Sequence, residues 1–151
     1  MPSSRETRRV SIDEAVLLAA RVTSGLLAGL YFAYAISVMP ALKRTSDQTY
    51  AEIMNTINVV IVNPLFLIFA FLGAPATAVL LLFWDRSGWA VAGAVLGVVT
   101  LLVTAVFNIP LNNALAKNSN RGAFEVPWVR WNIVRTLTGI ASFVCLLLIQ
   151  F

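Results

Sequence analysis

Four long apolar stretches set the strongest limit on what this chain can fold into. They cover approximately residues 15–39, 65–84, 89–107 and 128–149. A helix of about 20 residues, rising about 1.5 Å per residue, crosses the roughly 30 Å hydrocarbon core of a bilayer. Hydrophobic residues make up 59% of the chain, above the roughly 45–50% typical of soluble domains. We therefore predict an all-α fold, an integral membrane four-helix bundle.

The connections between the apolar stretches are too short for a second domain. Residues 11–151 are therefore expected to form a single four-span membrane domain. Residues 1–10 are polar and basic, and we expect them to form a flexible tail. Ser11 followed by Glu14 matches a capping box, which predicts the start of the first helix. The first stretch is too long for a signal-peptide core and no cleavage site follows it, so we expect it to be retained.

Residues 45–62 differ from the spans around them. Tyr50, Met54, Ile57 and Ile61 recur at helical spacing and form one apolar stripe, with polar residues elsewhere. The segment is too polar to cross a bilayer and too periodic for a loop. We predict an additional interfacial helix between spans one and two, folded back over the mouth of the bundle.

Prolines mark the expected breaks between helices. Pro40 is predicted to end span one, and Pro64 to separate the interfacial helix from span two. Pro75 is predicted to kink span two. Pro110 is expected to interrupt span three near its end and to free backbone carbonyls there. Residues 118–127 are then expected to form a polar loop.

Small residues predict where helices approach each other. Gly25 and Gly29 form a small-xxx-small pair, suited to close helix contact. Thr100 and Thr104 share a face and are predicted to make interhelical hydrogen bonds. Glycine-rich faces are also compatible with a homo-oligomer. Cys145 is expected to be a small core residue, since a lone cysteine forms no disulfide within the chain.

Charge and composition narrow the partners and cofactors. The net charge is +4, but the basic residues lie in the tail and loops, where they meet lipid headgroups, so we expect a lipid bilayer as partner and no nucleic acid. The tail favours both termini on the cytoplasmic side of a bacterial-type plasma membrane. The chain has no histidine, which removes His-held haem, His-containing zinc sites and the facial iron triad. We expect no metal and no tightly held cofactor.

A polar stripe opens the last apolar stretch. Trp128, Trp131, Asn132 and Arg135 recur at i, i+3, i+4 and i+7, so they share one helix face. Such groups at a membrane span are costly unless they pair or bind something. Four spans with both termini on one side bring this stripe to the same mouth as the end of span one and the interfacial helix. The residues expected to converge there are Tyr34, Met54, Asn55, Asn58, Asn108, Asn112, Asn113, Trp131, Asn132 and Arg135.

These elements also form a family pattern. Tyr31-Phe-Ala-Tyr34, Met39-Pro-Ala-Leu42, the run from Phe107 to Asn113 (Phe-Asn-Ile-Pro-Leu-Asn-Asn) and Trp128-Val-Arg-Trp-Asn132 with Arg135-Thr136 stand in order along the chain. Together they resemble the DUF1772 membrane proteins, often called the anthrone oxygenase-like family. Some relatives act in aromatic polyketide pathways, where they oxidise an anthrone to an anthraquinone with O2. The resemblance implies a monooxygenase with O2 as co-substrate, although many relatives have no assigned activity.

The absence of metal ligands fits this chemistry. An anthrone carries an acidic CH2 group, and the carbanion left by proton loss can pass one electron directly to O2. The protein must take the proton, stabilise the enolate oxygen and exclude water. Arg135 is predicted to stabilise the enolate, with Asn132 and Asn108 as further donors. The base stays open among Asp47, Glu52, Glu125 and a tyrosinate near Arg135.

Aromatic rings are expected to wall a flat hydrophobic substrate by stacking. The predicted substrate-binding set is Tyr31, Tyr34, Met54, Asn55, Asn58, Asn112, Asn113, Trp128 and Trp131. Structural alternatives compete with each role: indoles anchor helices at membrane interfaces, and Arg135 can clamp loop carbonyls. Two further functions stay open. One is a cofactor-free cyclase or isomerase of a hydrophobic natural product, and the other is a non-catalytic lipid-binding or accessory membrane protein.

Overall fold

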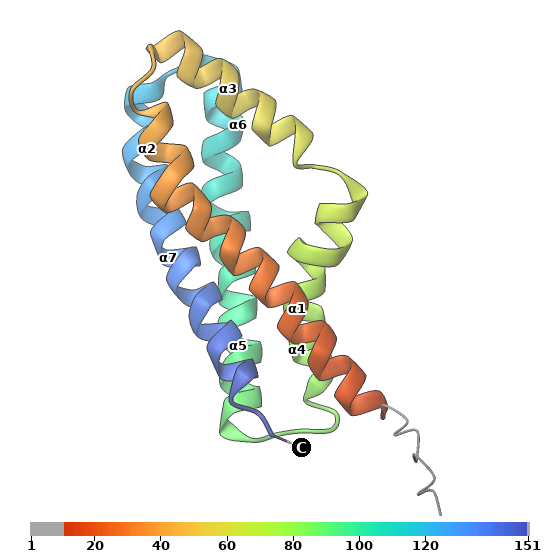
Figure 1. The fold of residues 1–151 in the computed structure, drawn as a ribbon. Coiled ribbons are helices and arrows are strands. Elements are labelled where there is room, and N and C mark those ends of the chain that lie inside the picture. Colours follow the sequence, from red (N-terminus) through yellow and green to blue (C-terminus); the bar gives the residue numbers. More distant parts are fainter. Residues whose placement is uncertain (1–10, 151) are drawn as a thin grey trace, which may run out of the picture.

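The structure, a computed structural model, describes residues 11–150, which are mostly helical and contain no strand (Figure 1). The predicted flexible tail, residues 1–10, lies outside the described residues. The all-α prediction is confirmed for the described part. In chain order the elements are α1 (Ile12–Ala33), the π-helical turn η1 (Tyr34–Val38), α2 (Met39–Leu42), α3 (Asp47–Val60), the π-helical η2 (Phe66–Leu72), α4 (Gly73–Leu81), α5 (Gly88–Val103), the π-helical η3 (Thr104–Asn108), α6 (Ile109–Asn118) and α7 (Arg121–Leu147).

Apart from α3, the described elements join end to end into four longer helices, called rods below, which pack side by side. The rods are Ile12–Leu42, Phe66–Leu81, Gly88–Asn118 and α7. α7 packs mainly against α5 and α1, and α1 packs also against α4. α3 lies across the end of the molecule where α2, α6 and the start of α7 meet (Figure 1). At the opposite end Arg21 of α1 donates hydrogen bonds to the carbonyls of Leu146 (3.0 Å) and Ile149 (2.6 Å), which joins the start of the chain's first helix to the end of its last.

Two of the rods have the length and apolar character needed to cross a membrane. They are Ile12–Leu42 and Gly88–Asn118, each 31 residues long. The segment Phe66–Leu81 is apolar but shorter. Within the described residues, this finding supports a membrane location through length and composition.

Pro40 and Pro110 do not end helices, contrary to the sequence prediction. Each lies at the second position of an α-helical segment that directly follows a π-helical turn. A π-turn shifts the backbone hydrogen bonds from i→i+4 to i→i+5, so the helix can continue without the N–H that proline lacks. The rods therefore run on to Leu42 and Asn118.

The predicted polar loop at residues 118–127 is also wrong. α6 ends where Ser119 adopts a left-handed conformation (φ 49°). Its N–H still donates to the carbonyl of Leu115 (2.8 Å). Asn120 then caps the next helix by accepting a hydrogen bond from the backbone N–H of Ala123 (3.1 Å). Because both caps are local, the break is only two residues long, and Pro127 lies inside α7.

The predicted helix between spans one and two is confirmed as α3 (Asp47–Val60). Ser46 caps it by accepting from the backbone N–H of Thr49 (3.2 Å). Tyr50 and Met54, two members of the predicted stripe, are fully buried. The helix ends before Pro64, where Asn63 Oδ1 accepts from the N–H of Phe66 (2.9 Å) and starts the next rod. Residues 61–65 form the connection between α3 and η2, called the linker below.

Small side chains set the spacing of α1, α5 and α7. A Cβ on Gly139 of α7 would lie 3.7 Å from the Cα of Ala28, so the α1 backbone passes close by. Gly25 lies under the ring of Phe143, as its predicted role requires, but Gly29 faces open space and makes no such contact. Thr100 Oγ1 lies 2.8 Å from Thr138 Oγ1, which confirms an interhelical hydrogen bond between α5 and α7.

Gly139→Leu is expected to destabilise the protein by about 1–3 kcal/mol, because its Cβ would already contact Ala28 and Thr100 at 3.7 Å and the atoms beyond it would have to displace them. Thermal unfolding in detergent measures the effect. Gly29→Leu is the matched control, since nothing lies within 4 Å of its Cβ position. Equal melting temperatures for the two leucine variants would contradict this account of α1–α7 packing.

Candidate functional site

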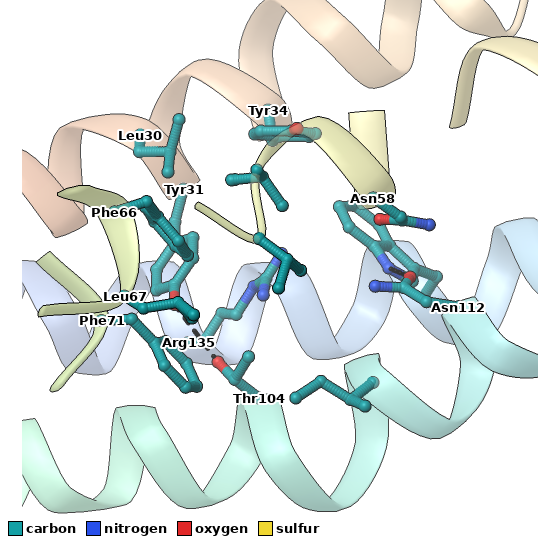
Figure 2. Close-up of a pocket in the computed structure, with 14 residues that line it drawn as sticks. Leu30, Tyr31, Tyr34, Asn58, Phe66, Leu67, Phe71, Thr104, Asn112 and Arg135 are labelled. Atoms are coloured by element: carbon teal, nitrogen blue, oxygen red, sulfur yellow. Dashed lines mark hydrogen bonds between the residues drawn. The ribbon is translucent and has the colours of Figure 1, made fainter. Parts of the chain in front are cut away.

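A cavity of about 110 Å³ lies beneath the linker, between α1, η2, η3 and α7 (Figure 2). Its mouth includes two exposed apolar side chains, Val62 of the linker and Ile109 of α6. Its walls are mainly aromatic and aliphatic, with a few polar groups. The lining residues are Leu30, Tyr31, Tyr34, Asn58, Ile61, Val62, Phe66, Leu67, Phe71, Thr104, Ile109, Asn112, Trp128 and Arg135.

Arg135 is the charged group of this cavity. Its side chain is buried, at 6% exposure, and reaches from α7 toward the ring of Tyr31 (Figure 2). The guanidinium carbon lies 4.1 Å from the Tyr31 ring centre and 5.0 Å from that of Trp128, within cation–π distance. Among the described residues no carboxylate pairs with it. The buried guanidinium is therefore held by aromatic faces and one amide, and no anion in the described structure neutralises its charge.

Asn132 holds Arg135 in place. Arg135 Nε donates to Asn132 Oδ1 (3.0 Å), and Asn132 Nδ2 donates to the backbone carbonyl of Tyr31 (3.3 Å). The amide is fully buried and does not line the cavity. Because both ends of the amide are occupied, Asn132 orients the guanidinium and joins α7 to α1.

Asn108 is likewise fully buried behind the cavity wall. Its Nδ2 donates weakly to the carbonyl of Trp128 (3.4 Å), and its Oδ1 has no hydrogen-bond partner in the described structure. The geometry therefore places Asn132 and Asn108 next to lining residues, with Arg135 alone of the three facing the cavity.

Two hydrogen bonds fix the aromatic walls. The hydroxyl of Tyr31 lies 3.4 Å from Thr104 Oγ1, across the cavity floor (Figure 2). This contact also confirms the predicted interhelical role of Thr104. Trp128 Nε1 donates to Asn112 Oδ1 (2.7 Å). The rings of Tyr34 and Trp128 lie 5.8 Å apart and tilted, so they form adjoining walls rather than a closed stack.

The carboxylates considered as bases lie away from the cavity. Asp47 and Glu125 both pair with Arg121, at 3.1 Å and 2.7 Å. Glu52 is exposed and accepts a hydrogen bond from Gln48 (2.9 Å). Of the candidates, only Tyr31 and Tyr34 line the cavity with Arg135.

Arg121 has a structural role that was not predicted, because residues 118–127 were expected to form a loop. It begins α7 and donates to the carbonyls of Lys43 (3.0 Å) and Thr45 (2.9 Å), while its guanidinium lies 4.5 Å from the centre of the Tyr50 ring. Burial, together with repulsion from Glu125, raises the pKa of Tyr50 well above its usual range, so this phenol stays neutral. These contacts hold α3 over the cavity.

Comparison with known families agrees with this architecture. A sequence model described as anthrone oxygenase matches residues 54–145, from the middle of α3 to near the end of α7. The chain belongs to the anthrone oxygenase family. The resemblance to DUF1772 proteins is therefore confirmed. No curated protein and no solved structure matches the chain.

The family match covers Arg135, Trp128 and Asn112 but begins after Tyr31 and Tyr34. Among the described residues, no three side chains of His, Cys, Asp or Glu lie together as a metal site would require. The anthrone oxygenase match therefore includes most of the cavity lining, from Asn58 to Arg135, and leaves out only the α1 and η1 side.

Four predicted binding residues lie outside the cavity lining. Trp131 stacks on Phe107, with ring centres 3.5 Å apart. Met54 is buried in the core with Tyr34, Asn55 is partly buried on α3, and Asn113 is exposed. Their sequence positions place them at the correct end of the bundle, but the rotation of each helix turns their side chains elsewhere.

The lining residues absent from the prediction are mostly apolar. Phe66, Leu67 and Phe71 come from η2, and no sequence signal marked this π-helical segment. Thr104 is polar, and it shares a helix face with Asn108. That pattern could have placed it among the predicted binding residues.

Proposed function

We propose that this protein is a membrane-embedded, cofactor-independent oxygenase that oxidises a hydrophobic, enolisable, anthrone-like substrate with O2. Family membership supports the reaction class. The observation that carries the proposal is Arg135, a buried cation without a carboxylate partner in the described structure, facing an aromatic cavity.

A bilayer location for all four rods belongs to this proposal. Large apolar side chains are exposed around the outside, including Leu26 of α1 (63%), Leu102 of α5 (53%) and Leu137 of α7 (63%). Soluble monomers rarely expose such extensive apolar surface. We propose that Phe66–Leu81 and α7 cross the membrane with the two longer rods, and that α3 lies at its surface.

The proposed reaction needs no electron carrier. Loss of one CH2 proton leaves an enolate, which passes one electron to O2 to give a substrate radical and superoxide. The two combine to form a C–O bond, and the resulting peroxide takes a proton. Loss of the second hydrogen from that carbon with cleavage of the O–O bond releases water and leaves a second carbonyl. Overall, anthrone plus O2 gives anthraquinone plus water.

The residues contribute charge, position and exclusion of water. Arg135 stabilises the oxygen on which negative charge develops, and Asn132 holds the guanidinium toward it. The rings of Tyr31 and Trp128 bound the flat substrate. The cavity is smaller than the roughly 300–1,000 Å³ of typical ligand pockets, so a tricyclic substrate extends beyond it through the mouth.

Oxidation of an anthrone by the purified protein tests the proposal. Quinone absorbance and O2 uptake are expected to rise together, one quinone per O2 consumed, well above spontaneous autoxidation. Leu67→Trp fills the cavity and is expected to lower the rate at least about tenfold, because the pocket positions the reacting atoms. Leu65→Trp is the control, since this side chain is exposed and outside the lining. A wild-type rate equal to autoxidation would contradict the proposal.

A further inference from the structure

The cavity contains one cation and, in the described residues, no group suited to accept a proton. α1 and η1 contribute the phenols of Tyr31 and Tyr34, and α7 contributes Arg135. α3 and its linker contribute an amide and aliphatic groups, η2 contributes phenyl and aliphatic groups, and η3 with α6 contributes a hydroxyl, an amide and an aliphatic group. A phenol with the ordinary pKa near 10 is protonated near neutral pH, so little phenolate is present to act as a base.

The surroundings of Arg135 strengthen its attraction for an anion. Tyr31 and Trp128 cover the guanidinium with rings, and its Nε donates a hydrogen bond to the neutral amide of Asn132. Removing a charge from water weakens its solvation and strengthens its interaction with any charge brought nearby. An acid that places its oxygen within about 4–6 Å of such a cation loses its proton more easily.

We propose that this cavity binds planar aromatic weak acids, namely enols and phenols, as their anions, and that Arg135 rather than a protein base causes the ionisation. The neutral acid reaches the cavity past Val62 and Ile109, at the membrane surface where α3 is proposed to lie. Its O–H or C–H bond breaks, the electron pair stays on the ligand, and the proton leaves with water at the mouth. This inference rests on the proposed function and defines the substrate class of that site.

One consequence separates this mechanism from base catalysis. A planar phenol that cannot react with O2 should bind as a phenolate, and the quinone products of phenolic substrates should bind in the same way. Because the bound form is the anion, affinity should increase as pH rises through the range below the free ligand's pKa, and should level off above it.

The test uses 2-hydroxyanthraquinone, whose phenolate absorbs at longer wavelength than the phenol. The protein in detergent is titrated with pH in the presence of this dye, without any turnover. In the wild type the apparent pKa of the bound dye is expected to fall by about one to three pH units. Arg135→Gln should abolish the shift, and Arg135→Lys should keep its direction. Arg130→Gln, at an exposed position on the same helix, should leave the shift unchanged.

Three results would overturn the inference: no binding of the dye by the wild type, binding with an unshifted pKa, or the same shift in Arg135→Gln. Thermal unfolding of each variant shows whether it is folded. The oxidation assay keeps the two proposals apart. An unshifted dye with full anthrone oxidation would leave the oxygenase standing and require a base on the protein, whereas a shifted dye without oxidation would leave an anion site and remove the oxygenase.

Discussion

Arg135→Gln is expected to lower kcat/KM for anthrone oxidation by roughly 10²–10³-fold, the cost of removing one preorganised donor to a developing oxyanion. Glutamine keeps a hydrogen-bond donor at the position of arginine Nε, but it lacks the terminal nitrogens and carries no charge. The enolate then forms in a cavity walled by rings and neutral amides, where nothing offsets the loss of its solvation.

The fold should survive this change. Arg135 is buried with aromatic faces and one amide as partners, so removing its charge also removes the free energy spent on its desolvation. We expect a melting temperature close to that of the wild type, measured in the same detergent as the rates. Arg130→Gln is the matched control on the exposed face of α7. Equal rates for Arg135→Gln and the wild type would show that the guanidinium is a structural clamp.

The helical rods could be predicted because apolar length is a local property. Each predicted span overlaps a rod of the structure, although the spans 65–84 and 128–149 run past the helix ends at Leu81 and Leu147. α3 lies where the stripe of Tyr50 and Met54 placed it. Two of the errors come from proline. Pro40 and Pro110 predict breaks on local grounds, but π-helical turns before them let both helices continue. Packing between rods favours continuous helices there, and single-residue preferences do not contain that information.

The site was predictable to the level of a helix face and no further. Trp128 and Arg135 are seven residues apart and both line the cavity, whereas Trp131 between them stacks on Phe107 outside it. Spacing puts all three on one broad stripe, but the rotation of α7 decides which part of the stripe faces inward. That rotation is set by the packing of α7 against α5 and α1, which the spacing of residues within one segment does not contain. Asn112 and Asn113 show the same limit, since only Asn112 faces the cavity.

Asn132→Asp is expected to reduce anthrone oxidation by at least about 100-fold through charge alone. The new carboxylate would stand where Asn132 Oδ1 now accepts from Arg135 Nε, at 3.0 Å, and would pair with the guanidinium. The new carboxylate would then neutralise the charge of Arg135, and the guanidinium would stabilise the negative charge of the enolate much less. The downward shift of the bound dye's pKa should disappear with the activity.

Stability should change little, because the losses and gains in Asn132→Asp are of similar size. The hydrogen bond from Nδ2 to the Tyr31 carbonyl is lost, at a net cost of about 0.5–1.5 kcal/mol, and the new ion pair offsets part of it. Asn118→Asp adds the same charge at the exposed end of α6 and should keep wild-type rates. Full activity in Asn132→Asp would mean that the reaction does not depend on an unpaired cation. In that case Arg135 would act through its shape and its contacts with Tyr31 and Trp128, and the source of enolate stabilisation would have to be sought among the amides of Asn58 and Asn112.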